Sequence, residues 1–156
     1  MKKKIQMFTD GSCLKNPGSG GFCVIIKYFT YQKIISKGFY LTTNNRMELM
    51  AAIYGFKALK EKCNVTITTD SQYLRKGILF WYKNWEKNNW KKKNKNKIKN
   101  KDLWILLHNL LNSHKIKWIW TKGHIKNTIQ NLCDIIARKE AKNPKYYDKK
   151  YQFKKK

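Results

Sequence analysis

The chain has 156 residues and carries 35 Lys and Arg against 9 Asp and Glu, a formal net charge of +26. This length fits one domain with one core, and 42% hydrophobic and 14% aromatic residues exclude a mostly disordered chain. No apolar run approaches the roughly 18 residues of a membrane helix, so we expect no membrane association. The large positive charge favours a nucleic acid as the partner.

The N-terminus and the cysteines indicate the cellular compartment. The first residues are basic and lead directly into a strand pattern, without the apolar segment of a signal peptide. None of the 4 cysteines lies in a C-x-x-C pair, which argues against a zinc knuckle. We therefore expect a cytoplasmic protein with reduced thiols.

The N-terminal part of the chain predicts three strands and a helix. The strands are residues 4–10, 22–28 and 33–41, all rich in β-branched and aromatic residues. A Gly-rich turn region over 11–21 separates the first two, and hairpin connections make all three antiparallel neighbours. Thr43, Asn44 or Asn45 caps the helix that follows, in which apolar residues recur at helical spacing.

The rest of the chain alternates strands and helices. Residues 65–69 and 116–120 are predicted strands, Ser71 and Asp102 each cap a helix, and the last helix covers about 128–141. This order predicts an α/β protein with a mixed five-stranded sheet, whose first three strands are antiparallel, and with helices packed on it. The strand-to-helix crossovers make the first, fourth and fifth strands parallel.

We predict one folded unit with two basic appendages. The folded domain is assigned to residues 1–142 and includes a basic protrusion at about 80–101. Residues 143–156 contain six lysines and one proline with little periodicity, and are predicted to form a loose basic tail.

Four carboxylates lie near the ends of predicted elements, although the chain has few acids. Asp10 and Asp70 close the first and fourth strands, Glu48 lies one turn into the first helix, and Asp134 lies in the last helix. Because parallel strands end at one edge of a sheet, Asp10 and Asp70 should meet there. Converging carboxylates repel one another unless a cation neutralises them, and oxygen ligands suit Mg²⁺ or Mn²⁺. The pattern therefore predicts a metal-dependent enzyme that acts on a polyanion.

Five short motifs follow one another in a recognisable order. They are Asp10-Gly11-Ser12, Asn44-Asn45-Arg46-Met47-Glu48-Leu49, Thr69-Asp70-Ser71-Gln72-Tyr73, Lys122-Gly123-His124 and Cys133-Asp134. With these motifs, the chain closely resembles bacterial type I ribonuclease H from about residue 3 to 143. The resemblance implies the ribonuclease H-like fold and hydrolysis of the RNA strand of RNA–DNA hybrids, leaving 5′-phosphate and 3′-hydroxyl ends.

The resemblance also implies the catalytic roles. The catalytic acids would be Asp10, Glu48, Asp70 and Asp134, holding two divalent ions, Mg²⁺ or alternatively Mn²⁺. His124 would transfer a proton near the leaving group or assist product release. The segment 125–131 departs from the family, because it lacks the usual Gly, Pro and acidic residues, and Leu41 replaces a common Arg.

The expected substrate is an RNA–DNA hybrid, bound on two surfaces. In the protrusion, nine lysines between residues 83 and 101 interleave with aromatic residues and would grip DNA phosphates, while Trp81 and Trp85 pack on sugars. The resemblance assigns further contacts by position. Minor-groove contacts are implied for Cys13, Asn16, Asn44, Asn45 and Gln72, and a DNA-phosphate pocket for Thr43 and Asn100.

Two other function classes fit parts of the pattern. A non-catalytic hybrid-binding protein would share the basic surface, but binding alone does not require four carboxylates in one place. A polynucleotidyl transferase such as an integrase core would share the carboxylates, but the protrusion and the Asn44-Asn45 turn argue against it. We expect a monomer without an obligate protein partner.

Overall fold

The computed structural model describes residues 2–91, 98–122 and 128–154, and the side chains of these ranges up to Tyr151. One sheet with the strand order β3-β2-β1-β4-β5 organises the molecule. Its strands are β1 (Lys3–Cys13), β2 (Gly18–Tyr28), β3 (Tyr31–Thr42), β4 (Cys63–Thr69) and β5 (Lys115–Trp120). The first three strands pair antiparallel, and β4 pairs parallel with both β1 and β5. The predicted mixed five-stranded sheet is confirmed.

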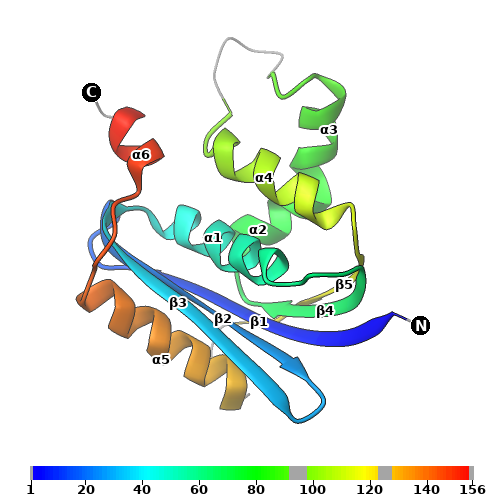
Figure 1. The fold of residues 1–156 in the computed structure, drawn as a ribbon. Helices are drawn as coiled ribbons and strands as arrows, with labels where there is room; N and C mark the ends of the chain where they lie inside the picture. Colours follow the sequence, from blue (N-terminus) through cyan, green and yellow to red (C-terminus); the bar gives the residue numbers. More distant parts are fainter. Residues whose placement is uncertain (1, 92–97, 123–127, 155–156) are drawn as a thin grey trace.

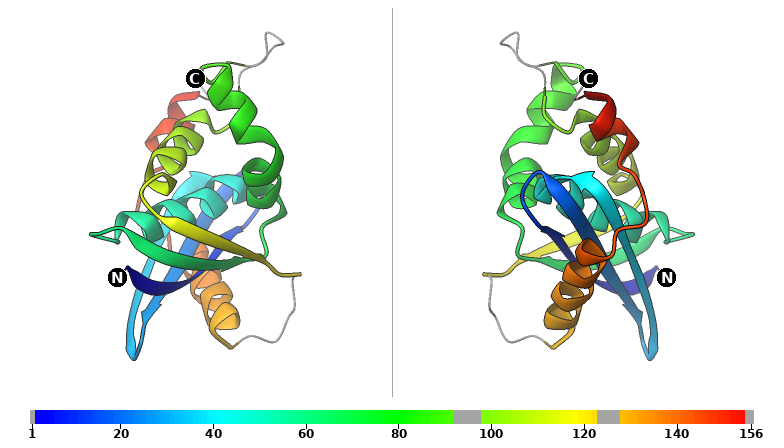
Figure 2. Two further views of the ribbon diagram at one scale, coloured as in Figure 1. Left: turned by 90° about the vertical axis from the view of Figure 1, so that its right-hand side faces the viewer. Right: turned by 90° about the vertical axis from the view of Figure 1, so that its left-hand side faces the viewer.

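Helices cover both faces of this sheet (Figures 1 and 2). They are α1 (Asn44–Lys57), α2 (Gln72–Lys76), the π-helix η1 (Gly77–Trp81), α3 (Tyr82–Lys87), α4 (Lys101–Leu111), α5 (Thr128–Lys142) and α6 (Lys149–Lys154). Helix α1 packs on one face with α4 stacked outside it, and α5 packs on the other face. None of the helices in the described ranges has both the length and the apolar composition needed to cross a membrane.

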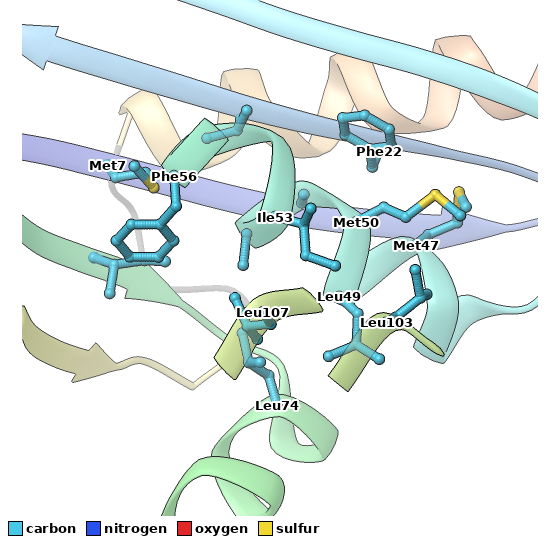
Figure 3. Packing of buried hydrophobic residues seen from close by; sticks show 14 of the residues in the cluster. Met7, Phe22, Met47, Leu49, Met50, Ile53, Phe56, Leu74, Leu103 and Leu107 are labelled. Atoms are coloured by element: carbon cyan, nitrogen blue, oxygen red, sulfur yellow. The ribbon is translucent and has the colours of Figure 1, made fainter. Parts of the chain in front are cut away.

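The main core lies around α1. This helix lies between the sheet, which contributes Met7 and Phe22, and α4, which contributes Leu103 and Leu107 (Figure 3). Because α1 has packed neighbours on both sides, it is apolar around most of its circumference rather than along one stripe. It is therefore a rigid support for any polar side chain that it carries at its N-terminal end.

The loop predicted over residues 11–21 is mostly strand, which corrects that prediction. Strand β1 continues to Cys13 and β2 begins at Gly18. The glycines of this region serve close packing rather than turns: a Cβ at Gly21 would lie 2.5 Å from the Ala137 carbonyl oxygen of α5. Glycine inside a strand often marks such an approach by another backbone.

The start of α4 also differs from the prediction. The N-cap is Asn100, which has a left-handed backbone with φ of 58°, and Asp102 lies in the first helical turn. Asp102 does not cap the helix, because its carboxylate receives two hydrogen bonds from the Arg46 guanidinium.

The tail predicted to be loose is packed against the domain in its described part. The Tyr40 N–H donates to the Tyr146 carbonyl at 2.9 Å, and Tyr146 forms a β-bridge with Phe39. Asp148 is only 3% exposed and accepts from the Arg46 guanidinium at 2.6 Å. The prediction failed because the lysine-rich composition of the tail gives no sign that its one acid, Asp148, pairs with the buried Arg46.

Candidate active site

Asp10 and Asp70 meet because β1 and β4 are parallel and in register. Phe8 lies opposite Thr68, so Asp10 and Asp70, each two residues further along, come to the same edge of the sheet. Asp10 is 6% exposed and lies within β1, which continues three residues beyond it, whereas Asp70 follows β4 directly. The expected meeting of these two acids is confirmed.

Gly11 brings Glu48 to the same place. A Cβ at Gly11 would lie 2.6 Å from the Glu48 backbone nitrogen, so only glycine lets β1 approach the first turn of α1 this closely. The Gly11 N–H donates both to Asp10 Oδ1 at 2.9 Å and to Glu48 Oε1 at 3.0 Å. The Thr43 hydroxyl accepts from the Arg46 N–H at 3.2 Å and fixes where α1 begins, as predicted.

The three acids form a compact cluster. One carboxylate oxygen from each of Asp10, Glu48 and Asp70 lies within 4.8 Å of the others. Burial raises the pKa of Asp10 to about 8, helped by the charges of Asp70 and Asp134 and a hydrogen bond with Asp134. Burial, then the charges of Asp10 and Asp70, raise the pKa of Glu48 well above its usual value. Without a cation, these groups resist being ionised together.

The cluster fits a divalent cation. Glu48 Oε2 is buried and has no hydrogen-bond partner among the described residues, so a ligand oxygen is unused. Several carboxylate oxygens around one point are the donor set that Mg²⁺ or Mn²⁺ prefers. We conclude that Asp10, Glu48 and Asp70 form a candidate divalent metal site.

Asp134 lies at the edge of this site. Its charge and a hydrogen bond with it help to raise the pKa of Asp10, but it is not one of the three mutually close acids. Its side chain is 39% exposed and lies 3.2 Å from Arg138 Nε, one turn further along α5. The structure thus brings all four predicted acids together, and Asp134 is more exposed than the buried Asp10 and Glu48.

The raised pKa of Asp10 makes stability depend on pH when metal is absent. The unfolded pKa is near 3.8 and the folded one about 8, so stability is greatest below the unfolded value and is lost as pH rises through the folded value. In EDTA, Asp10→Asn should be more stable than wild type at pH 8 by at least about 1.4 kcal/mol, the equivalent of one pKa unit. Urea unfolding at pH 5 and pH 8 measures this. The difference should shrink at pH 5 and in Mg²⁺, and equal stabilities in EDTA at pH 8 would contradict the raised pKa of Asp10.

Several predicted substrate contacts line one cavity of about 650 Å³. Its lining residues are Asn16, Pro17, Thr43, Asn45, Arg46, Ile98, Lys99, Asn100 and Tyr151. Asn16 Oδ1 accepts from the Asn44 N–H at 3.1 Å, which joins the β1–β2 loop to the start of α1. Amide and hydroxyl groups beside Lys99 suit a phosphate oxygen, which is the ligand predicted for Thr43 and Asn100.

The other predicted contacts lie around this cavity or outside the described residues. Cys13 Sγ lies 3.6 Å from the Thr42 carbonyl, and burial raises the pKa of the Cys13 thiol. Gln72 is exposed at the start of α2. Trp81 and Trp85 are half-buried with rings 5.9 Å apart. His124, together with residues 92–97 of the protrusion and 125–127 of the altered loop, lies outside the described residues.

Arg46 is an important residue that the sequence analysis missed. It is 1% exposed and hydrogen-bonds to Asp102, Asp148 and Asn100. Burial disfavours its charge, but the bonds to the two carboxylates outweigh burial and raise its pKa. Two signals could have indicated this role. Arg46 is an arginine in a chain whose basic residues are nearly all lysine, and Asp148 is a lone acid in a lysine-rich tail.

Known proteins share both the sequence and the fold. The RNase H family model matches residues 2–142. The chain is 52% identical over 152 residues to proteins named Ribonuclease H from Salmonella arizonae and Salmonella paratyphi B, covering 97% of this chain and 98% of theirs.

Solved structures agree. LC9-RNase H1, described as a type 1 RNase H with the type 2 active-site motif, superposes with a TM-score of 0.83 at 26% identity, covering 93% of this chain and 75% of that one. LC11-RNase H1, solved in complex with an RNA/DNA hybrid, has the same fold, with a TM-score of 0.68 at 16% identity over 89% of this chain and 97% of that one. Sequence and fold agree, and the chain therefore belongs to the ribonuclease H family, as a nuclease of its bacterial type I branch.

Proposed function

We propose that this nuclease hydrolyses the RNA strand of RNA–DNA hybrids with two Mg²⁺ ions and leaves 5′-phosphate and 3′-hydroxyl ends. The observation that carries the proposal is the buried cluster of Asp10, Glu48 and Asp70 within a chain of net charge +26. A polyanionic substrate accounts for the surface charge, and bound cations account for the cluster. Two comparisons support this substrate: the relatives are named Ribonuclease H, and LC11-RNase H1, which has the same fold, was solved with an RNA/DNA hybrid.

Each residue of the site has a defined task in this proposal. Asp10, Glu48 and Asp70 hold the ions, with Asp134 at the rim completing the ligand set. The bound ions would supply an activated water and charge stabilisation of the leaving oxygen. The Gly11 N–H, which donates to both Asp10 and Glu48, orients the two carboxylates. His124 would move a proton near the leaving group or assist product release.

One cleavage assay tests the proposal. Labelled RNA–DNA hybrid, duplex DNA and duplex RNA are each incubated with the protein, with and without Mg²⁺. Of the three substrates, we expect only the hybrid to be cleaved, and only when Mg²⁺ is present. The products should carry 5′-phosphates. Hybrid binding without cleavage would indicate a non-catalytic binding protein, and transfer into duplex DNA would indicate a polynucleotidyl transferase.

The protrusion is proposed to hold the DNA strand. Lys83, Lys87 and Lys91 are exposed along and just after α3. Replacing all three by glutamine should weaken hybrid binding and lower the slope of log affinity against log salt by about 2 to 3, because each phosphate contact releases counterions. The rate at saturating substrate should change little.

A control variant removes the same charge elsewhere. Lys33, Lys60 and Lys62 are also exposed but lie far from the protrusion in sequence, in β3 and before β4. Their replacement by glutamine should lower the salt slope much less. Equal slopes for the two triple variants would show that the protrusion acts only through net charge.

The cellular setting is also part of the proposal. We infer a cytoplasmic monomer with a catalytic domain at residues 1–142, acting without an obligate protein partner. Sedimentation at working concentration tests the monomer, and the location of the tagged protein in cells tests the compartment.

A further inference from the structure

The C-terminal segment, defined as residues 146–151, is joined to the start of α1. Its Asp148 accepts from the Thr42 hydroxyl at 2.8 Å and from Arg46 Nε and Nη2 at 2.6 and 3.1 Å. The end of the chain, drawn in red in Figures 1 and 2, contacts β3 through α6. The segment follows residue 142, where the match to the family model ends, yet it is packed into the domain.

Arg46 connects this segment to the candidate phosphate cavity. Its backbone N–H donates to Thr43 Oγ1 at 3.2 Å, and its Nη1 donates to Asn100 Oδ1 at 3.3 Å. One residue therefore contacts both predicted phosphate ligands, and Asp148 holds its guanidinium from the other side. Asp148 thus helps to fix the guanidinium that contacts Asn100, whose Nδ2 also donates to the Tyr73 hydroxyl at 3.0 Å.

Tyr151 extends the segment into the cavity itself. It is half-buried and lines the cavity with Asn16, Thr43, Asn45 and Asn100. All four of these neighbours are predicted hybrid contacts, whereas nothing in the sequence had marked Tyr151. Tyrosine hydroxyls are among the side-chain groups that donate to phosphate oxygens in nucleic-acid complexes.

We propose that Tyr151 is a substrate-contacting residue that donates its hydroxyl to a backbone phosphate in this cavity, and that Asp148 is a positioning residue that acts through Arg46 on Asn100. The inference rests on the proposed function, because it needs a hybrid in the cavity. It enlarges the binding surface by a segment beyond the catalytic domain assigned from the sequence.

The test compares Tyr151→Phe with Tyr147→Phe. Tyr147 lies in the same segment but is 58% exposed, packs on Tyr40 and does not line the cavity. Loss of one phosphate hydrogen bond should raise the KM of Tyr151→Phe by about 3- to 10-fold with kcat within about twofold. Tyr147→Phe should keep the wild-type KM, and thermal unfolding should show both variants folded. Asp148→Asn should likewise raise KM more than it lowers kcat.

A substrate modification separates a contact from a structural effect. Single methylphosphonates, which neutralise one phosphate, are placed in turn along each strand of the hybrid, and binding is measured in EDTA. At one position the neutral linkage should weaken wild-type binding but not weaken Tyr151→Phe further. An unchanged KM for Tyr151→Phe, or additive losses at every position, overturns the inference. Failure of the wild type to cleave any hybrid would instead refute the proposed function.

Discussion

Replacing Asp70 with asparagine is expected to lower the rate of hybrid cleavage in Mg²⁺ by at least about 100-fold. The substitution keeps the shape of the side chain but removes one of the three carboxylates that meet within 4.8 Å. Asp10→Asn should have the same effect, since Asp10 is another of these three carboxylates and also lies beside Asp134. Single-turnover cleavage of a labelled hybrid at saturating enzyme measures the rate free of binding effects.

The matched control is Glu61→Gln. Glu61 is an acid of the surface, 56% exposed and paired with Lys3, so its loss removes the same charge outside the site. This variant should cleave at the wild-type rate, and circular dichroism should show all variants folded. If Asp70→Asn retained more than about a tenth of the wild-type rate, the assignment of the metal site would be wrong.

Arg46→Ala is expected to destabilise the protein by about 3–5 kcal/mol, the usual cost of removing one partner from a buried ion pair. The substitution leaves Asp148, which is 3% exposed, without its cationic partner. It also removes the bonds to Asp102 and Asn100, which join α1 to the start of α4. Urea unfolding at pH 7 measures the loss.

Arg138→Ala is the control for this prediction. Arg138 is 65% exposed and pairs with Asp134 on the surface of α5, so its loss should change stability by no more than about 1 kcal/mol. The double variant Arg46→Ala/Asp148→Ala should lose less than the sum of the single losses, because the buried Asp148 carboxylate is removed together with its cationic partner. Additive losses would show that the two side chains do not act as a pair.

The acidic site could be predicted because its residues lie at recognisable points of local structure. Asp10 and Asp70 accompany apolar strands, and Glu48 follows a helix cap, so period and capping alone locate them. Parallel pairing then brings two of them to one edge. The raised pKa values could not be predicted, because they depend on the burial and mutual distance of these acids.

Local composition misled where packing overrides it. The glycines between residues 11 and 21 indicate turns, but Gly11 and Gly21 lie in strands, where α1 and α5 approach them too closely for a side chain. Aspartate is a favoured N-cap residue, yet the Asp102 carboxylate accepts hydrogen bonds from the buried Arg46 guanidinium instead of capping the helix. In each case the deciding neighbour is far away in the sequence.

The sequence by itself determined the order of the elements, the mixed sheet and the four acids, because these follow from hydrophobic period, capping and strand direction, which are local properties. Only the tertiary structure decided that the C-terminal segment packs against the domain and that Tyr151 lines the cavity beside Thr43 and Asn100. The physical reason is that a buried charge must find its partner wherever the chain brings one. Asp148 satisfies Arg46 across 102 positions of sequence, and no local pattern records that pairing.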